Sequence, residues 1–298
     1  DTISIEYKNK MFSRNKAHFV PPPAAAGVLQ AQILGMLAHE GKFGGSSPQG
    51  KYHLLAETAL IGYAERGRWM QEDYSSKFPL KNLLTSSVLG RLASKYNDAR
   101  HVSPNSLQHK PSLISENPSA TSFVIVDNSG MAVSCVFSMN NSFGIGRIAP
   151  DTGIMIATIP EGIGRGPLSL SPMMIVNQYS NQLVLAASAS GGAMAATALA
   201  SVVARSYLDR ISLEVALASP RIHHRGIPDI TRYEPNLSTD VLSYLVERGH
   251  KVAVTPSIGL VNIAFCAGGL PRDPDSCTIL SDPRGHGLAI NALIDMED

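Results

Sequence analysis

Hydroxyl and amide side chains gather around one predicted β-hairpin, and a glycine pair follows it farther along the chain. Strand-forming residues run over 122–127 and 131–138, and Asn128-Ser129-Gly130 between them is a turn signal. Gly191-Gly192 stands directly before a helix-forming stretch of small residues at 193–207. Bare backbone at a helix start leaves its N–H groups open to an oxyanion, and the helix dipole favours negative charge there. The pair could therefore stabilise an oxyanion, although close packing of strand against helix explains it equally well.

The predicted helices and strands that must position these residues are grouped by type along the chain. Helical periodicity predicts helices over 28–39, 53–70, 89–95, 193–207, 215–218 and 239–248, the last with Ser238 as N-cap and Gly249 just beyond its end. Strands are predicted over 122–127, 131–138, 154–158, 174–177, 183–187, 251–254, 261–265 and 277–281. Hairpins and helices without β-α-β alternation indicate an α+β fold, with antiparallel sheet covered by helices.

The overall composition excludes several classes of function. Of the 298 residues 44% are hydrophobic, and 25 Lys and Arg against 24 Asp and Glu leave a net charge of +1. This balance supplies no basic patch for nucleic acid and no acidic tail. The apolar runs are too short for a transmembrane segment, and the first residues do not read as a secretory signal. A mature exported chain would look the same, so the compartment stays open.

Four segments, in order, resemble the gamma-glutamyltransferase family of N-terminal-nucleophile hydrolases. Each motif alone is weak, but four in the family's order over nearly the whole chain make a specific signal. They are Val20 to Gly27 (VPPPAAAG) with the helix that follows, Ala56-Glu57 with Tyr63 to Arg66, the hairpin from Ala120 to Gly146, and Pro167 to Arg284, which contains PLS, SGG, PRIHH and SDPR.

That resemblance implies an αββα sandwich, made as a precursor that cuts itself before a threonine. The threonine then becomes both the N-terminus and the nucleophile. Residues 1–119 would be the end of a large-subunit-like region, with an exposed polar linker at 100–119 that holds three prolines. Residues 120–298 would be the small-subunit-like region.

The chemistry implied by the resemblance is acyl transfer from a γ-glutamyl amide. An N-terminal threonine can use its own α-amine as general base, and backbone N–H groups stabilise the oxyanion. The family's motifs match Ser138 to a hydroxyl beside the nucleophile's amine, Asn140 and Ser169 to substrate-binding groups, and Gly191-Gly192 to the oxyanion site. Asn140 could equally satisfy backbone groups at the strand end.

At the family's nucleophile position stands Ala120. The family motif reads Thr-Thr-His-Tyr/Phe-Ser-Val-Val-Asp, and its gapless match here is Ala120 to Asp127 (ATSFVIVD), with Gly130 and Asn140 also in register. A methyl group cannot attack a carbonyl. Thr121 could replace it only through a one-residue shift, which needs a bulge because strand side chains alternate between faces. An engineered Thr→Ala change at Ala120 is the other open explanation.

Further departures affect the substrate pocket. The family's acidic pair is expected between 158 and 166, where the chain has Ile159-Pro160-Glu161-Gly162. The family's Pro-Leu-Ser-Ser-Met is Pro167-Leu168-Ser169-Leu170 here, so one of two serines is missing. The family's substrate-binding arginine belongs to an upstream segment, and Arg147 and Arg165 could lie near the pocket instead.

The remaining candidate ligands favour structural roles, so we expect no metal and no cofactor. Cys135, Cys266 and Cys277 are odd in number and have no CxxC spacing, which indicates buried free thiols rather than a disulfide framework or zinc site. His223-His224 resembles a metal pair, but adjacent residues rarely face one ion. Ser281 to Arg284 is interpreted as a structural turn with an Asp–Arg pair.

These departures favour a gamma-glutamyltransferase-like protein that is catalytically impaired and retained as a structural or binding subunit. The alternative is an active γ-glutamyl transferase or hydrolase of glutathione-like amides, through Thr121 or with Ala120 as an engineered change. An acylase of the same superfamily is a third, weaker hypothesis. Because a layered core without its cover exposes apolar surface, we expect a partner chain carrying the upstream half of the fold, or an oligomer.

Overall fold

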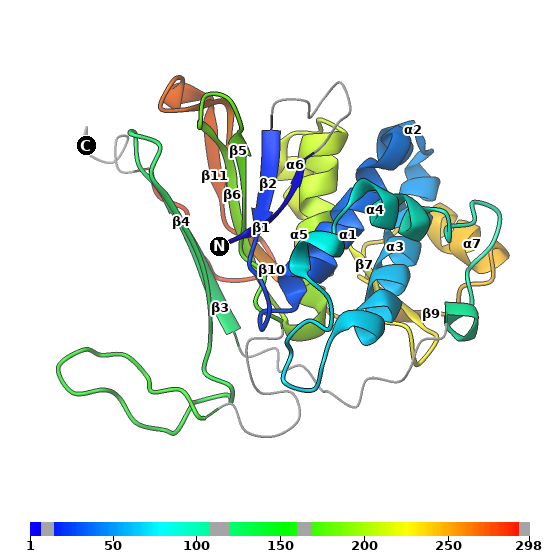
Figure 1. Cartoon of the computed structure of the whole chain (residues 1–298), viewed down its shortest axis with the longest axis horizontal. Helices are drawn as coiled ribbons and strands as arrows, with labels where there is room; N and C mark the ends of the chain where they lie inside the picture. The colour runs from blue at the N-terminus through cyan, green and yellow to red at the C-terminus, as the bar shows by residue number, and fades with distance from the viewer. Residues whose placement is uncertain (7–14, 108–119, 160–168, 292–298) are drawn as a thin grey trace.

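A six-stranded antiparallel sheet forms the centre of the molecule (Figure 1). The computed structural model describes residues 1–6, 15–107, 120–159 and 169–291. The sheet has the strand order β1-β2-β5-β6-β10-β11. Its strands are β1 (Ile3–Glu6), β2 (Asn15–Phe19), β5 (Met173–Asn177), β6 (Leu183–Ser190), β10 (Leu260–Leu270) and β11 (Cys277–Leu280). Both the 1–119 and the 120–298 segments therefore contribute strands to one sheet.

Helices cover one face of this sheet, on the right in Figure 1. Every residue of α1 (Ala26–Ala38) is buried, because this helix is apolar almost all round and packs between the sheet and its neighbours. The other helices are α2 (Lys42–Gly45), α3 (Pro48–Trp69), α4 (Ser86–Ala93), α5 (Ala195–Val203), α6 (Leu213–Ala218) and α7 (Thr239–Glu247). A π-helical turn, Ala204–Leu208, continues α5. None of the helices in the described part of the chain combines the length and apolarity needed to cross a membrane.

A two-stranded hairpin lies against the opposite face of the sheet, on the left in Figure 1. Its strands are β3 (Ala120–Val126) and β4 (Ala132–Ser138). Ser134 Oγ donates a hydrogen bond to Ala187 O at 2.7 Å, and Asn262 Nδ2 donates one to Ser122 O at 2.8 Å. With helices on one side and the hairpin on the other, all residues of β6 are buried, and its alanines and serines permit the close approach.

A small third sheet holds β7 (Ile222–His224), β8 (Thr231–Tyr233) and β9 (Val252–Val254) beside the helices. The β7–β8 pair is antiparallel and the β8–β9 pair is parallel. β7 and β8 were not predicted from the sequence, because three residues are too few to show a period. The strand predicted over 154–158 was wrong, since only an isolated bridge between Ile148 and Met155 forms there.

The predicted α+β class is confirmed, since antiparallel sheets are covered by helices in the expected chain order. The predicted caps of α7 are also confirmed. Ser238 Oγ accepts a hydrogen bond from Val241 N–H, and Gly249 follows the helix with a φ of 91°. Such a left-handed residue suits a helix end, and glycine adopts it without steric cost.

A buried ionic network joins the C-terminal motifs. Arg221 is fully buried, and its Nη2 lies 2.6 Å from Asp282 Oδ2. Arg284 binds Asp282 Oδ1 at 3.2 Å and Glu234 Oε2 at 2.6 Å. Burial lowers the pKa of Arg221 to about 10, with Asp282 opposing that shift, so the guanidinium stays charged at neutral pH. The predicted Asp–Arg pair of the SDPR turn is therefore confirmed.

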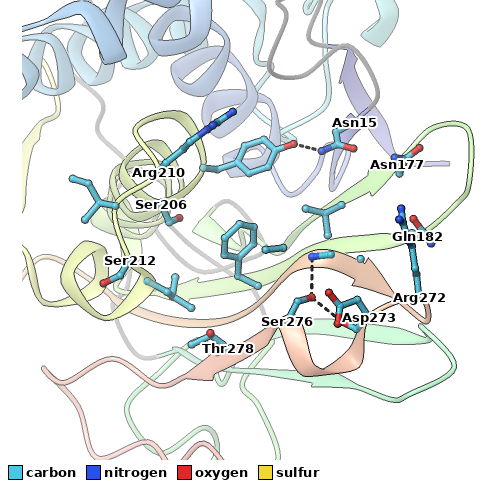
Figure 2. Close-up of a pocket in the computed structure, with 18 of the residues that line it drawn as sticks. Asn15, Asn177, Gln182, Ser206, Arg210, Ser212, Arg272, Asp273, Ser276 and Thr278 are labelled. Atoms are coloured by element: carbon cyan, nitrogen blue, oxygen red, sulfur yellow. Dashed lines mark hydrogen bonds between the residues drawn. The ribbon is translucent and has the colours of Figure 1, made fainter.

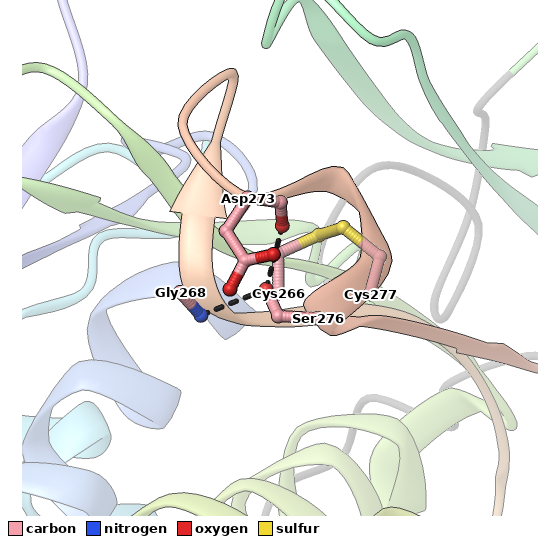
Figure 3. Close-up of a disulfide and its surroundings, with 5 residues drawn as sticks. All are labelled: Cys266, Gly268, Asp273, Ser276 and Cys277. Atoms are coloured by element: carbon pink, nitrogen blue, oxygen red, sulfur yellow. Dashed lines mark hydrogen bonds between the residues drawn. A yellow bond between two sulfur atoms is a disulfide. The ribbon is translucent and has the colours of Figure 1, made fainter.

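The prediction of free thiols was wrong for two of the three cysteines. Cys266 on β10 pairs directly with Cys277 on β11, and the two form a disulfide (Figure 3). Within the loop that this bond closes, Ser276 Oγ accepts from Gly268 N–H at 2.8 Å and donates to Asp273 O at 2.7 Å. Cys135 is a free thiol, but it is only partly buried, because the hairpin covers the sheet on one side alone.

Candidate active site at the hairpin

Ala120 and Ser138 face each other at the open end of the hairpin. The β3–β4 ladder runs without a shift from the pair Ala120–Ser138 to the pair Val126–Ala132. Burial alternates strictly along β3, so Ala120 is partly buried on the inner face and Thr121 is exposed on the outer face with Phe123. Thr121 pairs with Phe137, and no bulge brings its hydroxyl to the face that carries Ala120.

The hairpin points its open end toward the end of β6. At its tip, a Cβ added to Gly130 would lie 3.1 Å from Leu270 O, and Leu270 pairs with Leu183 at the start of β6. Near its base, Ser122 binds Asn262, whose partner on β6 is Ser188. Residue 120 and the glycines that follow Ser190 therefore lie toward the same end of the two sheets.

Gly191 and Gly192 form the tight connection from β6 to α5. Their φ angles are 129° and 59°, a region that favours glycine. A Cβ on Gly191 would lie 2.8 Å from Gly259 Cα, so close backbone packing requires glycine there. Gly192 opens a 3₁₀ turn that leads into α5. The close approach of Gly191 to Gly259 supports the packing explanation, and the oxyanion role stays a prediction.

Asn140 and Ser138 make local hydrogen bonds just beyond β4. Ser138 Oγ accepts from Asn140 N–H at 3.0 Å. Asn140 has a φ of 57°, and its Nδ2 donates to Thr158 O at 3.0 Å. This bond and those from Thr158 to Met139 O close the loop 139–158. In this arrangement the Asn140 amide supports the loop, and a role in binding substrate stays a prediction.

Other predicted pocket residues are not gathered around Ala120 by any described contact. Ser169 is partly buried and Arg147 is exposed. Residues 160–168 lie outside the described part of the chain, and so do Arg165, Pro167, Leu168 and most of the segment expected to replace the acidic pair.

Two large cavities lie elsewhere on the sheet. One, of about 990 Å³, opens between the start of α6 and the β10–β11 loop and is lined by Asn15, Asn177, Gln182, Arg210 and Arg272 among others (Figure 2). The other, of about 800 Å³, lies between β3 and β11 and includes Ser122 and Asn262. Neither cavity is lined by Ala120, Gly191 or Gly192, so neither forms around the predicted site.

The outer face of the hairpin and the loop after it carry an exposed apolar surface. Ile125 is 60% exposed and Phe137 is 51% exposed, although both lie in regular strand. The exposed large apolar residues here are Phe123, Ile125, Met131, Val133 and Phe137 on the hairpin, and Phe143, Ile145, Ile148, Ile154, Ile156 and Ile159 on the loop. An apolar surface of this extent is typical of an interaction site.

A second group of residues, with side chains that can bind metal or transfer protons, was not predicted from the sequence. His53, Glu57, His101, His250 and Asp229 meet between α3, the segment after α4, and the end of α7. Burial lowers the pKa of His101, but the adjoining Glu57 and Asp229 carboxylates outweigh it and raise that pKa above its ordinary value. Burial and then the neighbouring His101 charge lower the pKa of His250 to about 2. Their wide sequence separation left no motif to recognise.

The His223-His224 pair divides between two environments, as expected for adjacent strand residues. His223 Nδ1 lies 2.6 Å from Thr197 Oγ1. His224 instead faces Asp229, with Nε2 3.2 Å from Oδ1, and its Nδ1 accepts from Gly226 N–H. The two rings therefore do not face one common position.

Comparison with known proteins agrees with the motifs and with the fold. The gamma-glutamyltranspeptidase family model matches residues 2–159 and 161–292. The glutathione hydrolase proenzyme of Escherichia coli is 26% identical over 270 residues, covering 82% of this chain and 46% of the relative. That of a Pseudomonas strain is 27% identical over 308 residues, covering 91% and 52%. The chain thus spans about half the length of the curated relatives it matches.

Among solved structures, the cephalosporin acylase from Bacillus halodurans superposes with a TM-score of 0.69 at 20% sequence identity. The superposition covers 95% of this chain and 51% of that protein, and it supports the fold alone. With the family match over nearly the whole chain, these likenesses lead to one conclusion: the chain belongs to the gamma-glutamyltranspeptidase family.

Proposed function

We propose that this protein keeps the gamma-glutamyltranspeptidase fold without the family's nucleophilic chemistry and serves as a structural or binding subunit of a larger assembly. The observation that carries the proposal is Ala120 on the inner face of β3, in an unbroken ladder opposite Ser138. Acyl transfer in this family needs a hydroxyl at that position, and an alanine side chain has no lone pair to attack a carbonyl.

Moving Thr121 into the nucleophile position would destabilise the hairpin. A one-residue slip of β3 would turn Val124 toward solvent and Phe123 and Ile125 toward β6. It would also break the hydrogen bonds of Asn262 Nδ2 to Ser122 O and Oγ, at 2.8 and 3.0 Å. These contacts support the inactive form over an active enzyme that uses Thr121.

The exposed apolar surface supports the assembly part of the proposal. Side chains alternate between the two faces of β3 and β4, and those on the outer face are largely apolar, as in strands that another layer covers. The curated relatives are about twice as long as this chain. We infer that a partner chain carrying the upstream half of the family fold covers this surface, or else a second copy of this chain. Light scattering that finds only monodisperse monomers, alone and in the native extract, would count against this inference.

A γ-glutamyl anilide tests the loss of activity. The purified protein is expected to release no chromogenic amine above the rate of a Thr121→Val control. Release that Thr121→Val abolishes would overturn the proposal and establish Thr121 as the nucleophile. Ala120→Thr is the informative second variant. If it gains amine release, position 120 alone accounts for the lost activity; if it stays inactive, the altered substrate pocket contributes as well.

A further inference from the structure

We propose that His53, Glu57 and His250 form a binding site for one divalent transition-metal ion, with Zn²⁺ as the best match. His53 and Glu57 are one turn apart on α3, and His250 follows α7. All three are buried, and one ligand atom from each lies within 4.8 Å of the other two. Two imidazoles and a carboxylate are a donor set that zinc uses in proteins.

The distances suit an ion at the centre of the group. His250 Nε2 lies 2.8 Å from His53 Nδ1 and 3.6 Å from Glu57 Oε1. Tetrahedral zinc with bonds of about 2.0–2.1 Å holds its ligand atoms about 3.3 Å apart. These two separations lie on either side of that value, and the ligand atoms of all three residues lie within 4.8 Å of one another, so side-chain adjustments would bring them to the tetrahedral distances.

Each ligand is also oriented by an outer hydrogen bond. His53 Nε2 donates to Asn97 O at 2.9 Å, which leaves Nδ1 free of its proton and directed at the centre. His250 Nδ1 lies 2.8 Å from Thr231 Oγ1, and Glu57 Oε2 accepts from Val102 N–H at 3.0 Å. Metal-binding histidines are almost always held through their second nitrogen in this way.

The carboxylate of Glu57 supplies the one anionic donor among the three ligands. Glu57 Oε1 also lies 2.6 Å from His101 Nδ1, and His101 Nε2 lies 2.8 Å from the partly exposed Asp229, so the ligand carboxylate is held from a second side. Without metal, His250 Nε2–H donates to His53 Nδ1. When metal binds, that proton moves to His250 Nδ1 and donates to Thr231 Oγ1, so the exchange needs no further reactant.

Metal titration of the purified, chelator-treated protein tests the site. Calorimetry with ZnCl₂ is expected to give one ion per chain, and Co²⁺ is expected to give the visible absorption of a tetrahedral complex. His250→Gln and Glu57→Gln should each weaken Zn²⁺ binding at least 100-fold. Thr231→Val, which removes only the outer hydroxyl, should weaken it 10- to 100-fold. His18→Gln, which removes a partly exposed histidine elsewhere, should change nothing.

Circular dichroism on each variant separates lost binding from lost folding. If the ligand variants do not fold, binding by Thr231→Val decides whether the site exists. This variant is expected to fold, because valine fills the same buried space as threonine. The proposal is overturned if the native protein binds no stoichiometric Zn²⁺, or if folded His250→Gln and Thr231→Val bind it as tightly as the native protein does. The residues would then form a closed hydrogen-bond network only. The readouts do not involve γ-glutamyl chemistry, so the outcome is independent of the proposed function.

Discussion

The hairpin β3–β4 and the ionic network around Arg221 both correspond to family motifs, yet their surroundings differ. Arg221 and Asp282 are buried, and each contacts several partners. The hairpin carries exposed apolar side chains on one face and has Ala120 at the position that the sequence predicts for the nucleophile. The motifs that stabilise the fold are thus intact, while the motif that is predicted to perform chemistry differs from the family pattern at Ala120. Family resemblance in this chain therefore reports on the fold more strongly than on the activity.

The largest expected effect is on the ionic network. Asp282→Ala leaves Arg221 buried without its carboxylate and should lower the free energy of unfolding by about 3–5 kcal/mol. Urea denaturation measures it. Glu72→Gln, a change of an exposed carboxylate with no bond to the network, should stay within about 0.5 kcal/mol. Equal small losses for both variants would mean that the network contributes little.

A matched pair of truncations compares the two faces of the sheet. Leu185→Ala removes a fully buried side chain from β6 and should cost about 2–5 kcal/mol. Ile125→Ala removes a side chain that is 60% exposed on β3, so it should cost less than about 1 kcal/mol in the isolated chain. A large loss at Ile125 would indicate that the hairpin face is already covered, for example by a second copy.

The buried region should also respond to acid through His223. Burial, followed by the nearby His224 and arginine charges, lowers the pKa of His223 to about 3. As the pH falls, the unfolded chain binds a proton at His223 near pH 6.5, well before the folded chain does. The stabilisation that neutral His223 gives to the folded state is therefore complete above that pH. It is lost at about 1.4 kcal/mol per pH unit as the pH falls toward 3.

His223→Gln should make the fall in stability between pH 6.5 and 4 shallower, as measured by denaturation at each pH. An unchanged slope in the variant would show that other groups dominate the acid response. The exposed hairpin offers a comparison, since Ile125→Ala introduces no change in titrating groups and should leave the slope as it is.

Local patterns in the sequence predicted most of the long elements. Apolar periodicity predicted α1 and α3, and strand-forming residues around a turn signal predicted the hairpin, because each of these elements has seven or more residues. The short strands β7 and β8 have only three residues and could not be recognised. The disulfide depends on the register of β10 with β11, which an odd count of cysteines does not reveal.

The two candidate sites could not be predicted equally well from the sequence, for the same reason. Ala120 and Thr121 stand within a continuous motif, so their strand and their opposite faces could be predicted. The histidine group could not be predicted, because His53, His101 and His250 come from segments about 50 to 200 residues apart and meet only in the folded chain. Glu57 stands in the sequence only as part of the Ala56-Glu57 family motif, which does not reveal its histidine partners.

Intact-mass spectrometry of the purified protein tests the central claim most directly. The proposed function rests on Ala120 at the position that the family resemblance assigns to the hydroxyl of self-cleavage and catalysis. We predict that the protein stays unbroken between residues 119 and 121 after prolonged incubation. A fragment that begins at Thr121, and that disappears in Thr121→Val, would contradict it and show that the hairpin retains a working nucleophile.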